Sequence, residues 1–453
     1  MPAIAPARKA AFDILLAVER GKLHSDELLR GKPIDALSGA DRKLATTLVL
    51  GVLRWQIQLD HQIRPLLAKP NAKLDAEVLA ALRLGAFQIL FLDRIPAHAV
   101  IDDGVELVKK YGHRYASGMV NAVLRRLVGA VPADFPEDSA AALALAQAHP
   151  TWMVERWASF YGLDVARAIC LHGQEQSPTA IRIDNSDTVA EMNRAGVQLE
   201  PGALLESARI VVSGDIATTE AVRSGRARIQ DEGSQLVAEL AAASADNSEP
   251  HDILDSCAAP GGKTLILAER NPNARIVACE VSPKRHAQLR ERLASLASNV
   301  ECRLADATAL GEDSAFDLAL VDAPCSGTGT LGRNPEIRHR VTPEDLQRQA
   351  ERQCDLLSSA LRAVRPGGRV VYSTCSLEPE ENDQVVSAVL VDFAEAHQIS
   401  LGPQIELLQK RGILTSAGVE LLRNCITDEG ALRLVPGAMP TDGFYVALIE
   451  RNR

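Results

Sequence analysis

The sequence lacks the patterns that mark membrane-spanning, secreted and zinc-binding proteins. It has no run of about 18 apolar residues, so a transmembrane helix is not expected. The N-terminal residues mix acids and bases at helical spacing and lack the apolar core and cleavage pattern of a signal peptide. The 8 cysteines form no CxxC pair and show no regular spacing, which argues against a metal site or a disulfide framework. We therefore expect a cytoplasmic protein with reduced thiols.

The formal net charge of −10 argues against a nucleic-acid partner, but the charge is unevenly distributed. Residues 1–130 contain 19 lysines and arginines against 13 acids, a net charge of +6, whereas the remainder carries −16. A basic N-terminal part on an acidic body is typical of a phosphate-binding module. The alternative is chance variation on solvated helices. The length of 453 residues corresponds to roughly three domains.

Helical periodicity dominates the first third of the chain. Apolar residues recur at spacings of three and four between residues 8 and 129, which predicts a bundle of six or seven helices. Residues 130–150 are rich in Pro, Asp and Ala and are expected to form a linker. A small α+β part should follow. Three arginines of the bundle are candidate phosphate contacts, although arginines on helices more often simply face solvent: Arg54, Arg125 and Arg126. Three more lie in the α+β part, where packing within the core strands is the alternative: Arg223, Arg226 and Arg228.

From residue 251 onward, strands and helices alternate in a pattern typical of a doubly wound α/β sheet. Five strands are expected at 253–256, 276–280, 301–304, 316–322 and 369–374. A long helix should begin after Thr342, with Pro343 in the first helical position and acids in the first turn. A late strand at 444–449 is expected to close the edge of the sheet. Such sheets bind ligands outside the carboxyl ends of their strands.

Three of these strand ends suggest a cofactor site. The turn at 258–264 exposes backbone amides at a helix start, and its two glycines allow a ligand to approach closely. Its spacing to Lys263 is too short for a Walker loop, and it is not a GxGxxG motif. Glu280 ends the second strand, where an acid suits the ribose hydroxyls, and Asp306 follows the third, where a carboxylate can accept from an adenine amino group. Each acid alone is more often a solvated loop residue, but together they favour an adenosine-containing cofactor.

Two cysteines follow the fourth and fifth strands. Cys325 and Cys375 should face one crevice with Asp322, because these two strands are neighbours in a doubly wound sheet. A disulfide between them is disfavoured in a cytoplasmic protein. A free cysteine is usually a small buried hydrophobe. That interpretation is favoured for Cys170, Cys279, Cys302, Cys354 and Cys425.

Several segments resemble known families. DSCAAPGGKT (255–264), VDAPCSGTGTLGRNPEIRHRVTPEDL (321–346), YSTCSLEPEEN (372–382), TDGFYVALI (441–449) and IQDEGSQL (229–236) resemble the Nop/Sun family of RNA cytosine-5 methyltransferases. DRKLATTLVLGVLRWQIQLD (41–60) and VNAVLRRL (120–127) resemble the NusB family of RNA-binding helical domains. The combination implies a multidomain chain with an all-α NusB-like bundle at 1–135, a small α+β domain at 145–240 and a Rossmann-like α/β methyltransferase domain at 241–453.

The resemblance implies S-adenosylmethionine as cofactor and carbon 5 of a cytosine in 16S ribosomal RNA as the target. It makes Cys375 the nucleophile that adds to carbon 6, and Asp322 the partner of the cytosine amino edge. It makes Cys325 the group that helps remove the carbon 5 proton and release the product, with Lys263 near cofactor and substrate. The expected cofactor-binding residues are Cys257, Ala258, Ala259, Pro260, Gly261, Gly262, Lys263, Glu280, Arg285, Asp306 and Asp322.

This chain departs from the family pattern in two places, and three rival interpretations stay open. Glu280 stands where the family often has Asp, and residues 403–430 have no evident place. DNA cytosine methyltransferases use a Pro-Cys nucleophile, so Pro324-Cys325 permits reversed roles, in which the YSTCSLEPEEN motif has no function. A second interpretation is an RNA-binding assembly factor with a relic methyltransferase fold, and a third is an enzyme acting on another RNA. We expect a monomer that acts on unassembled or partly assembled ribosomal RNA, without a membrane or a metal.

Overall fold

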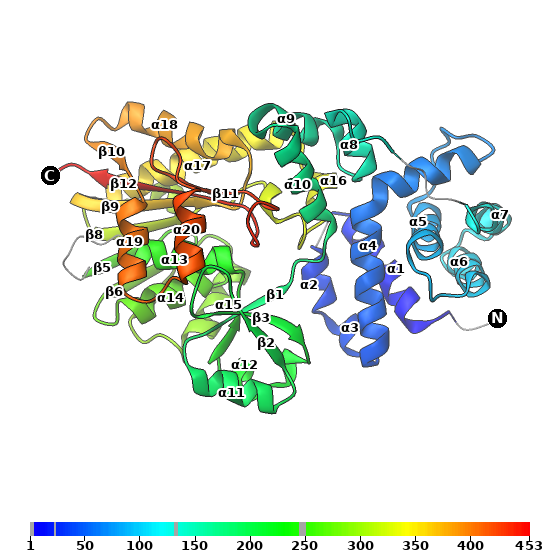
Figure 1. Ribbon diagram of the computed structural model, residues 1–453, viewed down its shortest axis with the longest axis horizontal. Coiled ribbons are helices and arrows are strands. Elements are labelled where there is room, and N and C mark those ends of the chain that lie inside the picture. Colours follow the sequence, from blue (N-terminus) through cyan, green and yellow to red (C-terminus); the bar gives the residue numbers. More distant parts are fainter. Residues whose placement is uncertain (1–3, 22–23, 131–134, 244–250) are drawn as a thin grey trace. The chain divides into compact units, whose positions relative to one another are not determined.

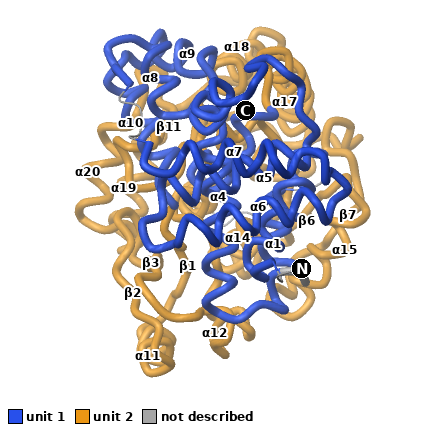
Figure 2. The backbone as a smooth tube through the Cα atoms, turned by 90° about the vertical axis from the view of Figure 1, so that its right-hand side faces the viewer, with its two compact units in different colours: residues 1–176, 331–340 blue, residues 177–330, 341–453 orange. Residues whose placement is uncertain are grey.

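The computed structural model describes residues 4–21, 24–130, 135–243 and 251–453. Its internal contacts divide the chain into two compact units, coloured separately in Figure 2. Unit 1 comprises residues 1–176 and 331–340, and unit 2 comprises residues 177–330 and 341–453. These units differ from the three-part division expected from the sequence. Unit 1 combines the helices of 140–174 with the N-terminal bundle, and unit 2 combines the small sheet with the large one.

The described residues of unit 1 form helices and connecting loops and include no β-strand. Its α-helices are α1 (Pro6–Glu19), α2 (Ser25–Leu29), α3 (Lys32–Asp35), α4 (Gly39–Ile63), α5 (Ala76–Phe91), α6 (Ala97–Lys110), α7 (Ser117–Leu127), α8 (Ala140–Ala146), α9 (Thr151–Tyr161), α10 (Leu163–Gln174) and α16 (Ile337–Arg340). The first seven confirm the predicted bundle. Their apolar faces meet in one core around Phe12, Leu48 and Leu124. Gly51 lets α4 and α5 approach closely, because a Cβ there would lie 1.9 Å from the Phe87 ring.

The linker predicted at 130–150 is wrong for the part that the structure describes. The alanine-rich segment Ala140–Ala146 forms α8, and its Leu143 side chain is fully buried. Arg167 of α10 binds Glu137 through an ion pair, with 3.0 Å between Nε and Oε2. The Pro and Asp residues that flank this segment suggested a linker. The outcome was decided instead by the strong helix propensity of alanine and leucine, together with burial.

A short segment far along the chain also belongs to unit 1. The Arg338 side chain on α16 is 1% exposed and donates hydrogen bonds to the carbonyls of Gly173 (2.8 Å), Arg54 (3.2 Å) and Ala148 (3.3 Å). The buried Glu336 carboxylate accepts from the backbone N–H (3.0 Å) and the hydroxyl (2.8 Å) of Ser25. Residues 331–340, which lie within the quoted segment 321–346 that contains Cys325, are therefore an internal part of the helical unit.

Unit 2 contains a small antiparallel sheet with the order β2-β3-β1-β4. Its elements are β1 (Thr179–Ile183), α11 (Ser186–Arg194), β2 (Gln198–Pro201), β3 (Ala208–Ser213), α12 (Glu220–Arg223) and β4 (Ala227–Ile229). Ile181, Ile183 and Met192 form its core. The α+β character was predicted. The edge strand β2 is short and mostly exposed and lacks alternating apolar residues, so its sequence carries little strand signal.

The large sheet of unit 2 has the order β10-β12-β9-β8-β5-β6-β7 (Figure 1; β7 is labelled in Figure 2). Its strands are β5 (Asp252–Asp255), β6 (Arg275–Glu280), β7 (Val300–Leu304), β8 (Phe316–Asp322), β9 (Val364–Thr374), β10 (Ala396–Ile399) and β12 (Phe444–Arg451), and β11 (Leu432–Leu434) pairs with β12. The five predicted strands form the parallel part. The late strand does not close the edge, because β12 lies between β9 and the unpredicted β10 and is antiparallel to both.

Helices cover both faces of this sheet. They are α13 (Glu232–Ala242), α14 (Gly262–Arg270), α15 (Pro283–Leu293), α17 (Pro343–Ala363), α18 (Asp383–Asp392), α19 (Gly402–Lys410) and α20 (Ser416–Arg423). One core joins α13, α14, α19 and α20 to the sheet, and another joins α17 and α18 to its opposite face (Figure 1). Residues 403–430, unplaced from sequence, thus form part of one helical layer. The predicted start of α17 is confirmed by a capping box between Thr342 and Asp345.

No helix among the described residues is both long and apolar enough to span a bilayer.

Candidate active site

The carboxyl ends of the parallel strands surround a cavity of about 350 Å³ in unit 2. The predicted site residues that line it are Cys257, Ala259, Glu280, Arg285, Asp306, Asp322, Cys325 and Cys375. A smaller cavity of about 90 Å³ is lined by further predicted residues, namely Ala258, Pro260, Gly262 and Lys263, and shares Cys257, Ala259 and Asp322 with the first. Gly261 lies in the turn between these residues. The sequence therefore identified groups that the fold brings to one edge of the sheet.

The two thiols that follow β8 and β9 are in contact. The distance from Cys325 Sγ to Cys375 Sγ is 3.4 Å, longer than the ~2.05 Å of a disulfide bond, and both cysteines are free. The strands pair in parallel with Asp322 opposite Ser373, which brings the residues after them together. The pKa of the Cys325 thiol is raised, mainly by its hydrogen bond with Cys375 and next by burial. The two thiols are therefore in direct polar contact.

An ion pair lies on the same rim. Lys263 Nζ is 2.6 Å from Asp322 Oδ2, and the Ser373 hydroxyl donates to Asp322 Oδ1 over 2.9 Å. Burial alone lowers the pKa of Lys263, but the Asp322 carboxylate outweighs it, so the net shift is upward. The Lys263 ammonium also lies 5.8 Å from the centroid of the Phe444 ring. A fixed cation and a fixed carboxylate thus stand next to the thiols.

The glycine turn precedes α14 and is held by arginines of α15. Gly261 has a φ of +95°, and a Cβ there would lie 2.9 Å from the side chain of Leu289. Arg285 Nη2 donates to the carbonyl of Ala259 over 2.8 Å, and Arg292 Nη1 donates to that of Pro260 over 3.1 Å. The backbone amides at the start of α14 are therefore presented by a turn whose conformation requires glycine.

The two predicted cofactor acids differ in environment. Glu280 at the end of β6 is 5% exposed, and its Oε1 accepts from the Ser282 amide over 2.8 Å. Arg285 Nη1 lies 3.6 Å from the other oxygen. Asp306 is exposed and accepts from the backbone N–H (3.0 Å) and the hydroxyl (2.8 Å) of Thr308, which lower its pKa. Both carboxylates line the cavity of about 350 Å³, and each keeps oxygen lone pairs that can accept further hydrogen bonds.

Two polar groups that the sequence did not single out also face these cavities. Burial raises the pKa of Asp255 to about 6; its Oδ2 accepts from the Thr264 hydroxyl over 2.7 Å, while its Oδ1 is buried without a partner. The neighbouring Ser256 hydroxyl is likewise buried without a partner. Both residues lie within the DSCAAPGGKT motif, which was the available signal. Orphaned buried polar atoms at a strand end fit a polar ligand.

Glu381 is the other residue that the sequence analysis missed. Its carboxylate is fully buried and accepts hydrogen bonds from Ser326 and Ser376, the residues that directly follow the two cysteines. The YSTCSLEPEEN motif contains Glu381, but its partner Ser326 lies 55 residues earlier. Among the described residues, no group of three metal-ligating side chains comes together at this site or elsewhere.

The expected phosphate contacts require one correction. Arg54 is 7% exposed and donates to the carbonyl of Gly332 over 2.7 Å inside unit 1, so it is not available at the surface. Burial lowers its pKa to about 10. Arg125 and Arg126 on α7 are exposed. In the α+β part, the contacts of the candidate arginines are ion pairs of Arg226 with Glu191 and of Arg228 with Glu269, while Arg223 is exposed.

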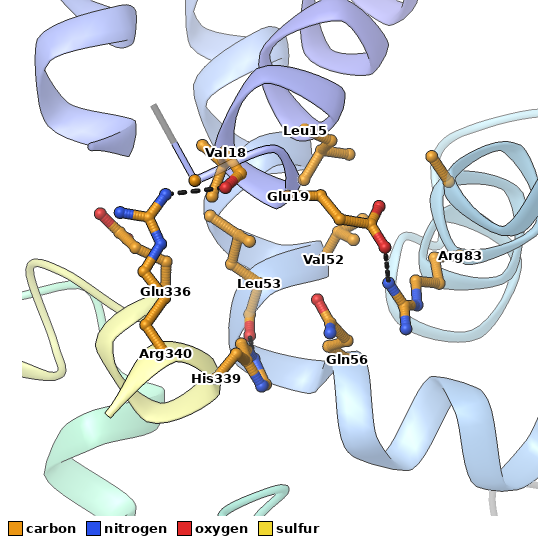
Figure 3. A pocket seen from close by; sticks show the side chains of 12 residues that line it. Leu15, Val18, Glu19, Val52, Leu53, Gln56, Arg83, Glu336, His339 and Arg340 are labelled. Atoms are coloured by element: carbon orange, nitrogen blue, oxygen red, sulfur yellow. Dashed lines mark hydrogen bonds and ion pairs between the residues drawn. The ribbon is translucent and has the colours of Figure 1, made fainter. Parts of the chain in front are cut away.

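A larger cavity of about 510 Å³ lies within unit 1 (Figure 3). Its walls combine apolar side chains of α1, α4 and α5 with residues of α16. His339 hydrogen-bonds to the carbonyl of Leu53 (2.8 Å), and Arg340 donates to that of Val18 (2.7 Å). No cysteine among the described residues lines this cavity. These residues also place no pair of free carboxylates there, because Glu336 already accepts a hydrogen bond from Ser25. The chemistry is therefore assigned to the smaller cavities of unit 2.

Comparisons with known proteins agree with this geometry. The family model "16S rRNA methyltransferase RsmB/F" matches residues 242–450, and the NusB family model matches residues 5–129. The chain is 33% identical over 458 residues to the probable ribosomal RNA small subunit methyltransferase B of Bacillus subtilis, covering 98% of both chains. It is 31% identical to the corresponding protein of Pseudomonas putida, covering 97% of both.

Solved structures give the same result. The crystal structure of PH0851 superposes with a TM-score of 0.80 over 99% of both chains, and its 24% identity supports the fold. A methyltransferase homologue from Pyrococcus horikoshii is 26% identical and superposes with a TM-score of 0.55 over 69% of this chain and 99% of that one. On the relatives that match it along nearly its whole length, the chain belongs to the RsmB/F family of methyltransferases, which use S-adenosylmethionine, and it carries a NusB-family domain.

Proposed function

We propose that this protein methylates carbon 5 of a cytosine in 16S ribosomal RNA through a covalent adduct with Cys375. The observation that carries the proposal is the 3.4 Å contact between the Cys325 and Cys375 sulfurs beside the Lys263–Asp322 ion pair. A single thiol is sufficient for a nucleophile. A second thiol in contact with the first, at the end of the neighbouring strand, suits a reaction that also needs a proton removed at the adjacent carbon.

The chain's own groups account for each step. The Cys375 thiolate adds to carbon 6, and the electron pair of the carbon 5–carbon 6 double bond shifts to give an enamine, which makes carbon 5 nucleophilic. Asp322 bonds the amino edge of the base and stabilises the developing charge. S-adenosylmethionine, when bound, would supply its sulfonium methyl group to carbon 5 and leave as S-adenosylhomocysteine. Cys325, once deprotonated, then removes the carbon 5 proton; the carbon 6–sulfur bond breaks and the Cys375 thiolate is restored.

The cofactor assignment rests on the strand ends. The cavity of about 350 Å³ is within the usual range of about 300–1,000 Å³ for small-ligand sites. Glu280 would accept from the ribose hydroxyls, Asp306 from the adenine amino group, and the glycine turn would meet the amino-acid portion through backbone amides. The orphaned Asp255 and Ser256 oxygens support a polar ligand at this position. Arg285, which lines the same cavity, also holds the turn and pairs with Glu280, and it remains a proposed cofactor-binding residue.

The proposed substrate is RNA whose target base can leave its stack. A base must be extruded for carbon 6 to reach a thiol in a cavity. The relatives' names specify ribosomal RNA of the small subunit, and the NusB-family domain with its net charge of +6 over residues 1–130 supports an RNA-binding role. Arg125 and Arg126 are the proposed phosphate contacts. Unassembled or partly assembled RNA is the proposed form of the substrate.

The test of this proposal is the identity of the product. The full chain is incubated with labelled S-adenosylmethionine and 16S ribosomal RNA, and the RNA is digested to nucleosides. We expect 5-methylcytidine at one position, its loss in Cys375→Ala, and its retention in Cys425→Ala, which alters a half-buried thiol elsewhere in unit 2. A label on another atom or another base, or no transfer at all, would contradict the proposal.

A further inference from the structure

One buried carboxylate joins the loops that carry the two thiols. Each cysteine is followed by a serine, and both serines bind Glu381. Glu381 Oε1 accepts from the Ser326 backbone N–H over 2.8 Å, while Oε2 accepts from the hydroxyls of Ser326 and Ser376. The two hydroxyls also lie 3.2 Å apart. Cys325 and Cys375 are therefore each one peptide unit away from a shared anchor.

Other elements fix this anchor in place. Gln353 on α17 donates to Glu381 Oε1 over 3.1 Å and to the carbonyl of Pro324 over 2.9 Å. The buried Tyr372 hydroxyl in β9 donates to the backbone carbonyl of Glu381 over 2.6 Å. Side chains from a helix and a strand thus leave the carboxylate little freedom to move. The position of each cysteine loop depends on the same atoms.

The chemistry of Glu381 suggests that its role is more than packing. Among the described residues, no lysine, arginine or histidine forms an ion pair with it, and burial raises its pKa, while the bonds from Ser326 and Ser376 lower it. A buried carboxylate without a counter-ion is costly unless several donors satisfy it. A neutral side chain of the same shape cannot accept at all four positions, since its amide nitrogen donates. This set of donors therefore requires a carboxylate, whereas a core selected for stability alone would not place one here.

We propose that Glu381 is a positioning residue that sets the separation of the two reactive thiols. This proposal rests on the proposed function, because only a reaction that uses two thiols needs them at a fixed separation. Glu381 touches neither substrate nor cofactor, since its side chain is fully buried behind the loops. By holding both loops, it keeps the Cys325 sulfur close to the carbon adjacent to the one that Cys375 attacks, so that adduct formation and proton removal occur in one geometry.

The direct test measures the thiol separation without any methyl transfer. The full chain is equilibrated in glutathione redox buffers, where two protein thiols reduce one glutathione disulfide to two glutathiones and form the Cys325–Cys375 disulfide. Peptide mass spectrometry quantifies this linkage. The variants are Glu381→Gln and a Ser326→Ala/Ser376→Ala pair, which keeps the carboxylate but removes both hydroxyl donors. Glu239→Gln is the matched control, a fully buried carboxylate in the same unit that binds Arg270 and Arg182 instead.

We call Glu381 with Ser326 and Ser376 the clamp. We expect the equilibrium constant for disulfide formation to fall at least tenfold in both clamp variants, Glu381→Gln and Ser326→Ala/Ser376→Ala, and to be unchanged in the control. Turnover should fall at least tenfold, with an unchanged KM for S-adenosylmethionine. An equilibrium constant within twofold of wild type in a folded clamp variant would overturn the proposal, as would a wild-type pair that forms no disulfide. If Glu381→Gln does not fold, the serine pair decides. A wild-type chain that shows the expected equilibria but makes no 5-methylcytidine would refute the proposed function and leave the clamp standing.

Discussion

The proposed cofactor site makes a quantitative prediction at Glu280. Its carboxylate is 5% exposed, and one oxygen is already bound by the Ser282 amide at 2.8 Å. The second oxygen lies 3.6 Å from Arg285 and can still accept from a ribose hydroxyl. Glu280→Gln preserves the volume and can keep the bond to Ser282, but it replaces the ribose acceptor by an amide NH₂. The substitution therefore removes one charge-assisted hydrogen bond to the ligand.

The expected magnitude follows from that single bond. A hydrogen bond to a charged group contributes about 1.5–3 kcal/mol, so the dissociation constant for S-adenosylmethionine should rise about ten- to a hundredfold. Asp306→Ala should weaken binding over the same range, while RNA binding stays near that of wild type. Isothermal titration calorimetry measures both. The control is Glu301→Gln, an exposed acid at the opposite end of β7 that pairs with Arg303 and Arg275.

Unchanged cofactor affinity in both Glu280→Gln and Asp306→Ala would refute the assignment of these two strand ends. An equal loss in Glu301→Gln would show that the effect comes from general charge rather than from the site.

Three other measurements test separate parts of the account. Reversing the charges of Arg125 and Arg126 to Glu should weaken RNA binding and make its salt dependence shallower, whereas equal slopes would show that the basic patch is incidental. Replacing Arg338 by Met leaves buried carbonyls unpaired and should lower the free energy of unfolding by about 1–3 kcal/mol for each carbonyl, measured by thermal unfolding against the largely exposed Arg30→Met in the same unit. The folded-state pKa of Asp255 is raised from 3.8 to about 6, so the folded state binds more protons between these values and its stability should fall as the pH rises through that window, by about 3 kcal/mol in all. Asp255→Asn should remove this part of the pH dependence in urea unfolding, and an unchanged difference between pH 4 and 7 would contradict it.

Local signals predicted much of the fold and of the site. The alternation of apolar strands with helices gave the five parallel strands, and the Thr342-Pro343 pair marked the start of α17. The order of reactive residues along successive strand ends correctly placed Cys325 and Cys375 in one crevice, because parallel strands present their carboxyl ends on the same edge. The chemical roles of these residues stay predictions.

Features that depend on distant partners could not be predicted. The position of β12 inside the sheet requires β10 to take the edge, and no local pattern in either segment specifies that pairing. The burial of Arg54 follows from its bond to Gly332, 278 residues away along the chain. The role of Glu381 likewise depends on Ser326. In each case the sequence shows the residue type, but the partner that determines its role is brought close only by tertiary packing.

The division of labour between the two thiols is the central claim, and trapping the covalent intermediate tests it most directly. Cys325→Ala and Cys375→Ala are each incubated with 16S ribosomal RNA and S-adenosylmethionine and then run on a denaturing gel, which a carbon–sulfur bond survives. Removing a late base traps an intermediate, whereas removing the early nucleophile prevents it. We expect a protein–RNA adduct in Cys325→Ala and none in Cys375→Ala. An adduct in Cys375→Ala but not in Cys325→Ala would contradict the account and make Cys325 the nucleophile.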